Sequence, residues 1–263
     1  MKIYGLQKLT LLDFPERVAC TVFLGGCDLR CPFCHNFELV DGLLPPVMDS
    51  DELLDFLRGR QKLLDGVVIT GGEPCLHTDL PDLMGEIRAL GYQIKLDTNG
   101  FHPEMLRRAL DGGLVDYVAM DIKNSPAGYA KTAGLASVDL GPLMESIAML
   151  KEWGASDTGC PPETGAAGSP AAGSFAAGSL AAETVSSDYE FRTTVVSEFH
   201  GAADFEEIGK MIAGAPHYYL QSFVDRDTVP RKGLHAPSAE EMEQYAAIAR
   251  QYVPDTRIRG MDV

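Results

Sequence analysis

Six short apolar segments recur along the chain and predict the strands of one sheet. They are rich in Val, Ile, Tyr and Phe, and they are nearly continuous rather than alternating. Such runs are typical of parallel strands that are buried on both faces. The segments are Val18–Leu24, Val67–Thr70, Tyr92–Asp97, Tyr117–Ile122, Glu190–Val196 and His217–Gln221.

Helical periodicity fills the intervals between these segments. Asp49 and Glu52 predict a capping pair at the start of one helix. A second helix has apolar residues at i, i+3, i+4 and i+7 spacing, followed by a glycine suited to a helix end. Its residues are Leu80, Leu83, Met84, Ile87, Leu90 and Gly91. Further helices are predicted over 103–111, 140–153, 204–213 and 238–252. Because strand and helix alternate six times, we predict an α/β fold, a partial (β/α)6 TIM-like barrel.

One segment, about 154–188, interrupts this alternation. It consists mainly of Ala, Gly, Ser, Thr and Pro, has no Lys or Arg, and repeats Ala-Ala-Gly-Ser at 166–169, 171–174 and 176–179. Such a composition buries too little apolar surface to offset its ordering entropy. We predict a single domain over 1–263 with a disordered insertion here; a tether that docks a partner is the alternative. Cys160 lies in this tract and is not counted as a ligand.

Composition and charge narrow the class of protein. A chain of 263 residues is long enough for one barrel-sized core. The net charge of −16 argues against a nucleic-acid surface, which needs clustered Lys and Arg. No apolar run has the length of a membrane span, and the first residues lack a signal-peptide layout. The sequence therefore predicts a cytoplasmic protein.

The most informative residues are Cys27, Cys31 and Cys34, in a C-x3-C-x2-C spacing directly after the first predicted strand. A short loop lets three sulfurs converge on one inorganic centre. Structural zinc sites and ordinary electron-transfer clusters usually take four protein ligands. Three cysteines therefore indicate a [4Fe–4S] cluster with one iron open to a non-protein ligand. A chance trio, or a zinc site completed by His35, remain alternatives.

Polar residues follow each predicted strand. Because the carboxyl ends of barrel strands meet at one rim, we expect these side chains to lie together. Beyond the cysteine loop, they are Gly71-Gly72-Glu73-Pro74, Asp97-Thr98-Asn99, Asp121-Ile122-Lys123, Arg192 and Gln221. This convergence on one rim indicates a functional site rather than a purely structural barrel.

The C-x3-C-x2-C motif with Phe33 before its last cysteine resembles the signature of the radical S-adenosylmethionine (SAM) superfamily. The surrounding sequence resembles the anaerobic ribonucleotide reductase activating proteins, a branch of the glycyl radical enzyme activases. The resemblance runs from Leu11-Leu12-Asp13-Phe14-Pro15 to Cys34-His35-Asn36. The resemblance implies an enzyme that reductively cleaves SAM and forms a glycyl radical on a partner. It also implies an anaerobic ribonucleotide reductase as that partner, and a flavodoxin or ferredoxin as electron donor.

The same resemblance implies roles for the rim residues. The cofactors would be a [4Fe–4S] cluster on the three cysteines, and SAM. Gly71, Gly72 and Glu73 would hold the SAM amino group, and Lys123 and Arg192 its carboxylate. Phe33 and the backbone near His35 would pack on adenine. Asn99 and Gln221 are also assigned to the cofactor site. Ion pairing on the rim is the alternative role for both Lys123 and Arg192.

A monovalent cation is predicted between two neighbouring strand ends. Asp97 and Asp121 would repel each other if unpaired, and the activases carry such a cation at the corresponding ends. The resemblance assigns it to Asp97, Thr98 and Asp121. Pairing of Lys123 with either carboxylate is an equal competitor.

Two other functions stay open. One is a radical SAM enzyme that acts on a small molecule, such as a 7-carboxy-7-deazaguanine synthase. The other is a non-catalytic iron–sulfur or zinc protein. No second cysteine cluster follows the first, which favours an activase of the single-cluster type.

Overall fold

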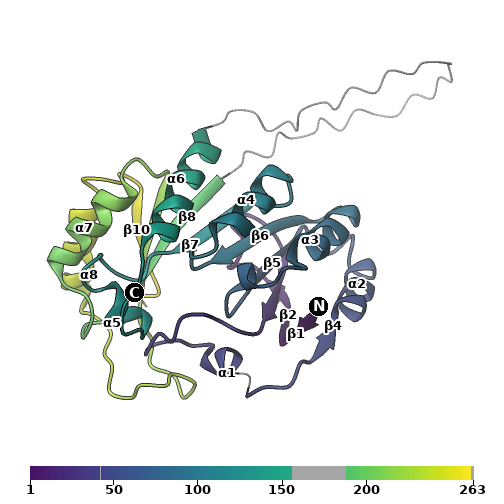
Figure 1. The fold of residues 1–263 in the computed structure, drawn as a ribbon, viewed down its shortest axis with the longest axis horizontal. Helices are drawn as coiled ribbons and strands as arrows, with labels where there is room; N and C mark the ends of the chain where they lie inside the picture. The colour runs from purple at the N-terminus through teal and green to yellow at the C-terminus, as the bar shows by residue number, and fades with distance from the viewer. Residues whose placement is uncertain (42, 156–187, 262–263) are drawn as a thin grey trace.

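The computed structural model describes residues 1–41, 43–155 and 188–261, and a curved eight-stranded sheet lies at its centre (Figure 1). The strand order is β10-β9-β8-β7-β6-β5-β3-β2. All neighbouring pairs from β3 to β10 are parallel, and β2 pairs with β3 antiparallel. The strands are β2 (Gly5–Thr10), β3 (Ala19–Leu24), β5 (Gly66–Gly71), β6 (Gln93–Thr98), β7 (Tyr117–Asp121), β8 (Asp188–Val195), β9 (His217–Ser222) and β10 (Thr256–Arg259). A small separate ladder joins β1 (Lys2–Ile3) to β4 (Met48–Asp49).

Helices surround the outside of the sheet in Figure 1. They are α1 (Phe37–Val40), α2 (Ser50–Arg58), α3 (Leu80–Ala89), α4 (Pro103–Asp111), α5 (Tyr129–Ala133), α6 (Gly141–Ala155), α7 (Ala202–Ile212) and α8 (Ala239–Ala249), with a 3-10 turn η1 at Pro74–Leu76. The capping pair predicted for α2 is confirmed, because Asp49 accepts from the Glu52 amide and Glu52 accepts from the Asp49 amide. No helix of the described residues is long and apolar enough to cross a membrane.

The six predicted strands are confirmed, each within two residues, and so is the partial barrel of α/β class. The sequence did not predict the edge strands β2 and β10. Polar residues interrupt both strands, Gln7, Lys8 and Thr10 in β2 and Thr256, Arg257 and Arg259 in β10, so neither carries a continuous apolar run. In the segment 154–188, Gly154 and Ala155 end α6 and Asp188 begins β8. The predicted disorder of the rest, 156–187, and Cys160 with it, lies outside the described residues.

The two faces of the sheet are filled differently. The outer face, with residues such as Cys20, Ile69 and Leu96, joins the main apolar core beneath the helices. The inner face carries a second, small cluster around Phe14 and Tyr117, whose ring centroids lie 6.2 Å apart. The ring of Phe14 also lies against Gly66, at the amino end of β5. The loop between β2 and β3 therefore closes the barrel at the amino ends of its strands.

Charged side chains occupy the inner face above this cluster. Lys95 is 2% exposed, and its Nζ lies 2.6 Å from Asp97 Oδ1. Glu190 is 1% exposed; it accepts from Tyr117 Oη at 2.8 Å and from both terminal nitrogens of Arg259 at 3.0 and 3.1 Å. We call Phe14, Lys95, Tyr117 and Glu190 the barrel floor.

We expect Phe14→Ala to lower the free energy of unfolding by about 3–5 kcal/mol, because it empties the apolar part of the barrel floor. Phe14 is 4% exposed, whereas Leu12, two residues earlier, is 90% exposed. Leu12→Ala should therefore change the free energy by less than about 0.5 kcal/mol. Denaturant unfolding of both variants measures the difference. Equal losses would show that the loop does not seal the barrel.

Candidate active site

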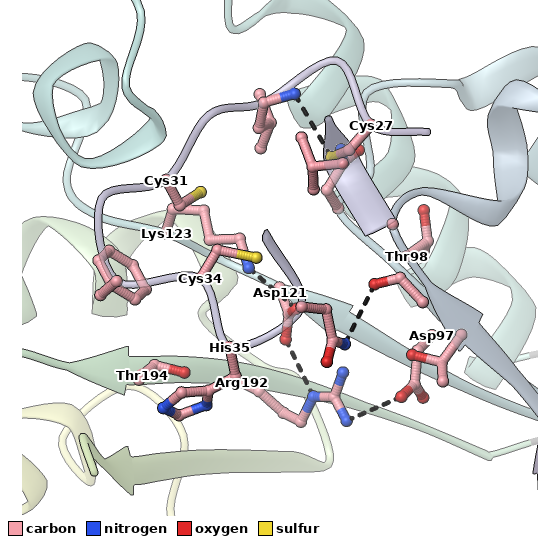
Figure 2. Close-up of a pocket in the computed structure, with 18 of the residues that line it drawn as sticks. Cys27, Cys31, Cys34, His35, Asp97, Thr98, Asp121, Lys123, Arg192 and Thr194 are labelled. Atoms are coloured by element: carbon pink, nitrogen blue, oxygen red, sulfur yellow. Dashed lines mark hydrogen bonds and ion pairs between the residues drawn. The ribbon is translucent and has the colours of Figure 1, made fainter. Parts of the chain in front are cut away.

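The cysteine loop begins where β3 ends, at the carboxyl edge of the sheet. It is held from both sides, since Arg30 N donates to Ala133 O of α5 at 2.9 Å and Gly26 N donates to Leu39 O at 3.0 Å. Within the loop, Cys34 N donates to Cys31 O at 3.1 Å. Figure 2 shows Cys27, Cys31 and Cys34 around one cavity, whose volume is about 250 Å³. The structure thus brings the three predicted ligands together.

Burial keeps the three thiols in their protonated form. Burial raises the pKa of Cys27 to about 12 and that of Cys31 to about 11, and it also raises the pKa of Cys34. They are therefore neutral at pH 7 until a bound metal replaces their protons. Cys20 and Cys75 are buried but do not line this cavity, which fits their exclusion as ligands.

A row of alternating charges crosses the cavity wall over β8, β7 and β6. Lys123 Nζ lies 3.0 Å from Asp121 Oδ2, and Arg192 Nε lies 3.0 Å from Asp121 Oδ1. The same guanidinium reaches Asp97 Oδ2 at 3.3 Å (Figure 2). Burial alone would raise the pKa of Asp121, but Arg192 and Lys123 outweigh it and hold that pKa at about 2. Both carboxylates are thus ionised and paired.

This row bears on two predictions. The ion-pair alternative for Lys123 and Arg192 describes their contacts in the structure. The place predicted for a monovalent cation, between Asp97 and Asp121, is bridged by the guanidinium of Arg192. Thr98, the third predicted ligand, donates its hydroxyl to Glu73 at 2.8 Å instead. The cation itself stays a prediction.

The Gly-Gly-Glu-Pro turn, which follows β5, is hydrogen-bonded to the end of β3 and to the start of the cysteine loop. Gly72 N donates to Leu24 O and Glu73 N donates to Gly26 O, both at 2.8 Å. A Cβ on Gly72 would lie 1.9 Å from Gly26 O, so this close approach requires glycine. Gly71 has φ +122 and needs glycine for its backbone conformation. Both glycines line the cavity.

The carboxylate of Glu73, which the resemblance assigns to the SAM amino group, forms its hydrogen bonds within the protein. Its carboxylate is 1% exposed and does not line the cavity. It accepts from Cys75 N at 2.9 Å, from Thr98 Oγ1 at 2.8 Å and from Asn99 N at 2.6 Å. Its carboxylate therefore joins the turn to the end of β6, and the cavity is bordered by the two glycines instead.

The remaining predicted residues, Phe33, His35, Asn99 and Gln221, all line the cavity. His35 points away from the three sulfurs in Figure 2, and its Nε2 lies 2.7 Å from Val224 O. This contact argues against His35 as a fourth metal ligand. Asn99 Nδ2 donates to Asp28 Oδ1 at 2.8 Å and so ties the cysteine loop to β6.

Sequence reasoning missed several residues of the site. Thr194 lines the cavity two positions after Arg192, and strand alternation from Arg192 would have found it. Asn36 donates to Gly71 O at 3.3 Å. His102 lies 3.2 Å from Asp28, and this carboxylate raises the pKa of His102. No local pattern signals the pairing of Asp28 with His102, since the two belong to separate loops.

Known proteins resemble this chain at three levels. The sequence profile of the Radical SAM superfamily matches residues 21–159 of the 263, more than half of the chain. A Methanocaldococcus jannaschii protein, provisionally named a glycyl-radical enzyme activating enzyme, is 26% identical over 270 residues, covering 99% of this chain and 96% of its own. The pyruvate formate-lyase-activating enzyme of Clostridium pasteurianum is 29% identical over 132 residues, covering 47% of this chain and 52% of its own.

Other similarities are more local or concern the fold alone. The 7-carboxy-7-deazaguanine synthase of Halobacterium salinarum is 37% identical over 75 residues, 28% of this chain and 29% of its own. The crystal structure of Streptococcus suis SuiB bound to S-adenosylmethionine superposes with a TM-score of 0.59 at 11% identity. That superposition covers 91% of this chain and 52% of the SuiB chain, and it supports the fold only.

Proposed function

This chain belongs to the radical SAM superfamily, and on that premise we propose that it activates a glycyl radical enzyme. Membership makes it an enzyme of radical chemistry and implies a [4Fe–4S] cluster and SAM as cofactors. When bound and reduced, the cluster supplies the electron that breaks a carbon–sulfur bond of SAM. The chain's own residues must then bind SAM, orient it and admit the substrate.

The site suits these cofactors. The thiols of Cys27, Cys31 and Cys34 border one cavity. Yet within the described residues no three His, Cys, Asp or Glu side chains converge on a single ion. A [4Fe–4S] cluster can take three cysteines and leave one iron open, whereas a structural zinc site takes four protein ligands, and His35 is turned to Val224 instead. This arrangement supports a cluster over the alternative zinc site.

We assign the SAM contacts as follows. Lys123 and Arg192 bind the carboxylate, because they are the cations on the cavity wall and Arg192 offers a planar pair of donors. The backbone of Gly71 and Gly72 receives the amino group. Phe33, with the backbone near His35, packs on the adenine, and Asn99 and Gln221 complete the pocket.

The filled barrel floor leaves the rim as the route by which a substrate reaches the cofactors. Phe14, Lys95, Tyr117 and Glu190 are buried and occupy the inside of the barrel towards the amino ends of its strands. An enzyme for a small substrate needs an enclosed pocket beside its cofactor. Here the substrate that gives up its hydrogen atom would reach the cofactors from outside the barrel, at the rim that holds the cysteines. A glycine in a backbone suits this access, because it has no side chain to block approach.

The choice of partner rests on sequence likeness. The M. jannaschii relative, aligned over 99% of this chain, supports an activase. The resemblance of the first forty residues to the anaerobic ribonucleotide reductase activating proteins supports an anaerobic ribonucleotide reductase as the partner. A flavodoxin or ferredoxin is the proposed electron donor.

The test follows hydrogen from the partner to SAM. Reduced, reconstituted protein with SAM alone should form 5′-deoxyadenosine slowly. A partner deuterated at the α-carbons of its glycines should pass deuterium into 5′-deoxyadenosine and gain a doublet radical signal in electron paramagnetic resonance. The unlabelled partner and the Cys31→Ala variant serve as controls, and neither should transfer deuterium. Transfer from a small molecule, with no radical on any partner, would overturn the activase function but not the family.

The second candidate is an enzyme that acts on a small molecule. The local identity to a 7-carboxy-7-deazaguanine synthase favours it, although the match spans 28% of this chain. Turnover of SAM with a purine-like substrate and no protein partner would support this candidate.

A further inference from the structure

A long loop over 223–238, between β9 and α8, contacts the cysteine loop. Connections of this kind usually have about 2–6 residues, so its length calls for a role. Val224 O lies 2.7 Å from His35 Nε2, and Arg231 N donates to Pro32 O at 3.1 Å. The ring of His35 stacks on Phe223 at 5.8 Å between centroids. This loop therefore borders the segment that holds Cys31 and Cys34.

Four exposed cations gather beside this segment, and we call them the basic surface: Lys131 of α5, with Arg226, Arg231 and Lys232 of the loop. Lys131 and Lys232 donate to backbone carbonyls, and among the described residues none of the four has an ion pair with a carboxylate. The acids of this region are Asp225 and Asp227 in the loop and Glu198, which contacts His235, so four cations stand beside three carboxylates. The surface is thus locally positive in a chain of net charge −16.

Two aromatic rings connect the basic surface to the cysteine loop. Lys131 Nζ lies 5.1 Å and Arg231 Cζ 5.5 Å from the ring centroid of Phe199. Phe199 in turn lies 5.9 Å from Phe33, which lines the cavity and stands between Cys31 and Cys34. Only the rings of Phe199 and Phe33 would therefore separate the cavity from a protein bound at Lys131 and Arg231.

We propose that the basic surface docks the one-electron donor, a small redox protein with an acidic face. An acidic donor would be repelled by this chain at long range, so a local positive surface is needed to orient the encounter. One electron passes from the donor, which is oxidised, to the cluster, which is reduced. The inference rests on the cluster that the family implies, and not on which glycyl radical enzyme is the partner.

The test compares two reductants of the reconstituted cluster in the double variant Lys131→Glu, Arg231→Glu. With flavodoxin hydroquinone as probe, reduction followed by stopped-flow absorbance should slow about tenfold or more and lose much of its salt dependence. With photoreduced 5-deazaflavin, which is small and uncharged, the rate should stay unchanged. The matched control is Lys8→Glu with Lys62→Glu, two exposed lysines away from the cysteine loop that give the same change in net charge.

Three results would overturn the proposal. One is an unchanged rate with flavodoxin, and another is equal slowing in the control variant. The third is equal slowing with both reductants, which would mean damage to the cluster. If glycyl radical formation driven by 5-deazaflavin fails while flavodoxin reduction is normal, the surface docks the glycyl radical enzyme instead. Deuterium transfer driven by 5-deazaflavin tests the proposed function separately.

Discussion

Replacing Cys27, Cys31 or Cys34 with Ala is expected to abolish SAM cleavage. Each thiol borders the same cavity beyond the end of β3, and removing one leaves too few sulfurs for a stable cluster. Iron and sulfide content after anaerobic reconstitution, the visible absorbance of the cluster, and 5′-deoxyadenosine formation measure the loss.

The chain supplies its own controls for this result. Cys20 and Cys75 are equally reduced and more deeply buried, but neither lines the cavity. Cys20→Ala and Cys75→Ala should each retain a cluster that responds spectroscopically to SAM. Loss of the cluster in either control would contradict the assignment of the three ligands.

The second large effect is expected from Gly72→Ala. The added Cβ would lie 1.9 Å from Gly26 O, a backbone atom next to Cys27 that already accepts from Glu73 N. Backbone cannot give way as a flexible side chain would, so the substitution should cost more than about 3 kcal/mol of unfolding free energy. It should also displace Cys27 and lower the iron content. Thermal unfolding and metal analysis measure the two effects.

Gly85→Ala is the matched control, because it adds the same methyl group to a helix. A Cβ at Gly85 would meet no atom within 4 Å. Replacing a glycine inside α3 should therefore stabilise the protein by about 0.5–1 kcal/mol. If Gly72→Ala behaved like Gly85→Ala, the turn and the cysteine loop would not be in the contact described here.

The fold was predictable where the chemistry of a segment is uniform. Val67–Ile69 and Tyr117–Met120 are continuous apolar runs, since both faces of these strands are buried there, and the polar residues Thr70 and Asp121 follow at the carboxyl ends. β10, by contrast, reads Thr-Arg-Ile-Arg; it pairs in parallel with β9, and its Arg259 forms an ion pair with Glu190 of β8. That pairing joins residues 69 positions apart, and no local window contains it.

The site was predictable at strand ends and unpredictable inside the barrel. The rule that polar residues gather at one rim located Asp97, Asp121 and Arg192 together. Lys95 and Glu190 each stand between apolar residues of the same strand, so the local sequence does not show why a charged side chain is buried there. Only the closed barrel, with Phe14 beneath them, shows why they are buried.

The position of Arg192 between two acids has a consequence for ligand exchange. Each acid has a second cation, because Asp97 also contacts Lys95 and Asp121 also contacts Lys123. Removing one partner of a buried ion pair usually costs several kcal/mol, about 3–5, because the other charge is stranded. When Arg192 turns towards the carboxylate of SAM, Asp97 keeps its contact with Lys95. The ammonium of Lys123 has three donors, so it can contact SAM and Asp121 together, and neither acid is stranded. The wall thus holds a spare counter-charge for each acid, and the guanidinium can change partners at low energetic cost.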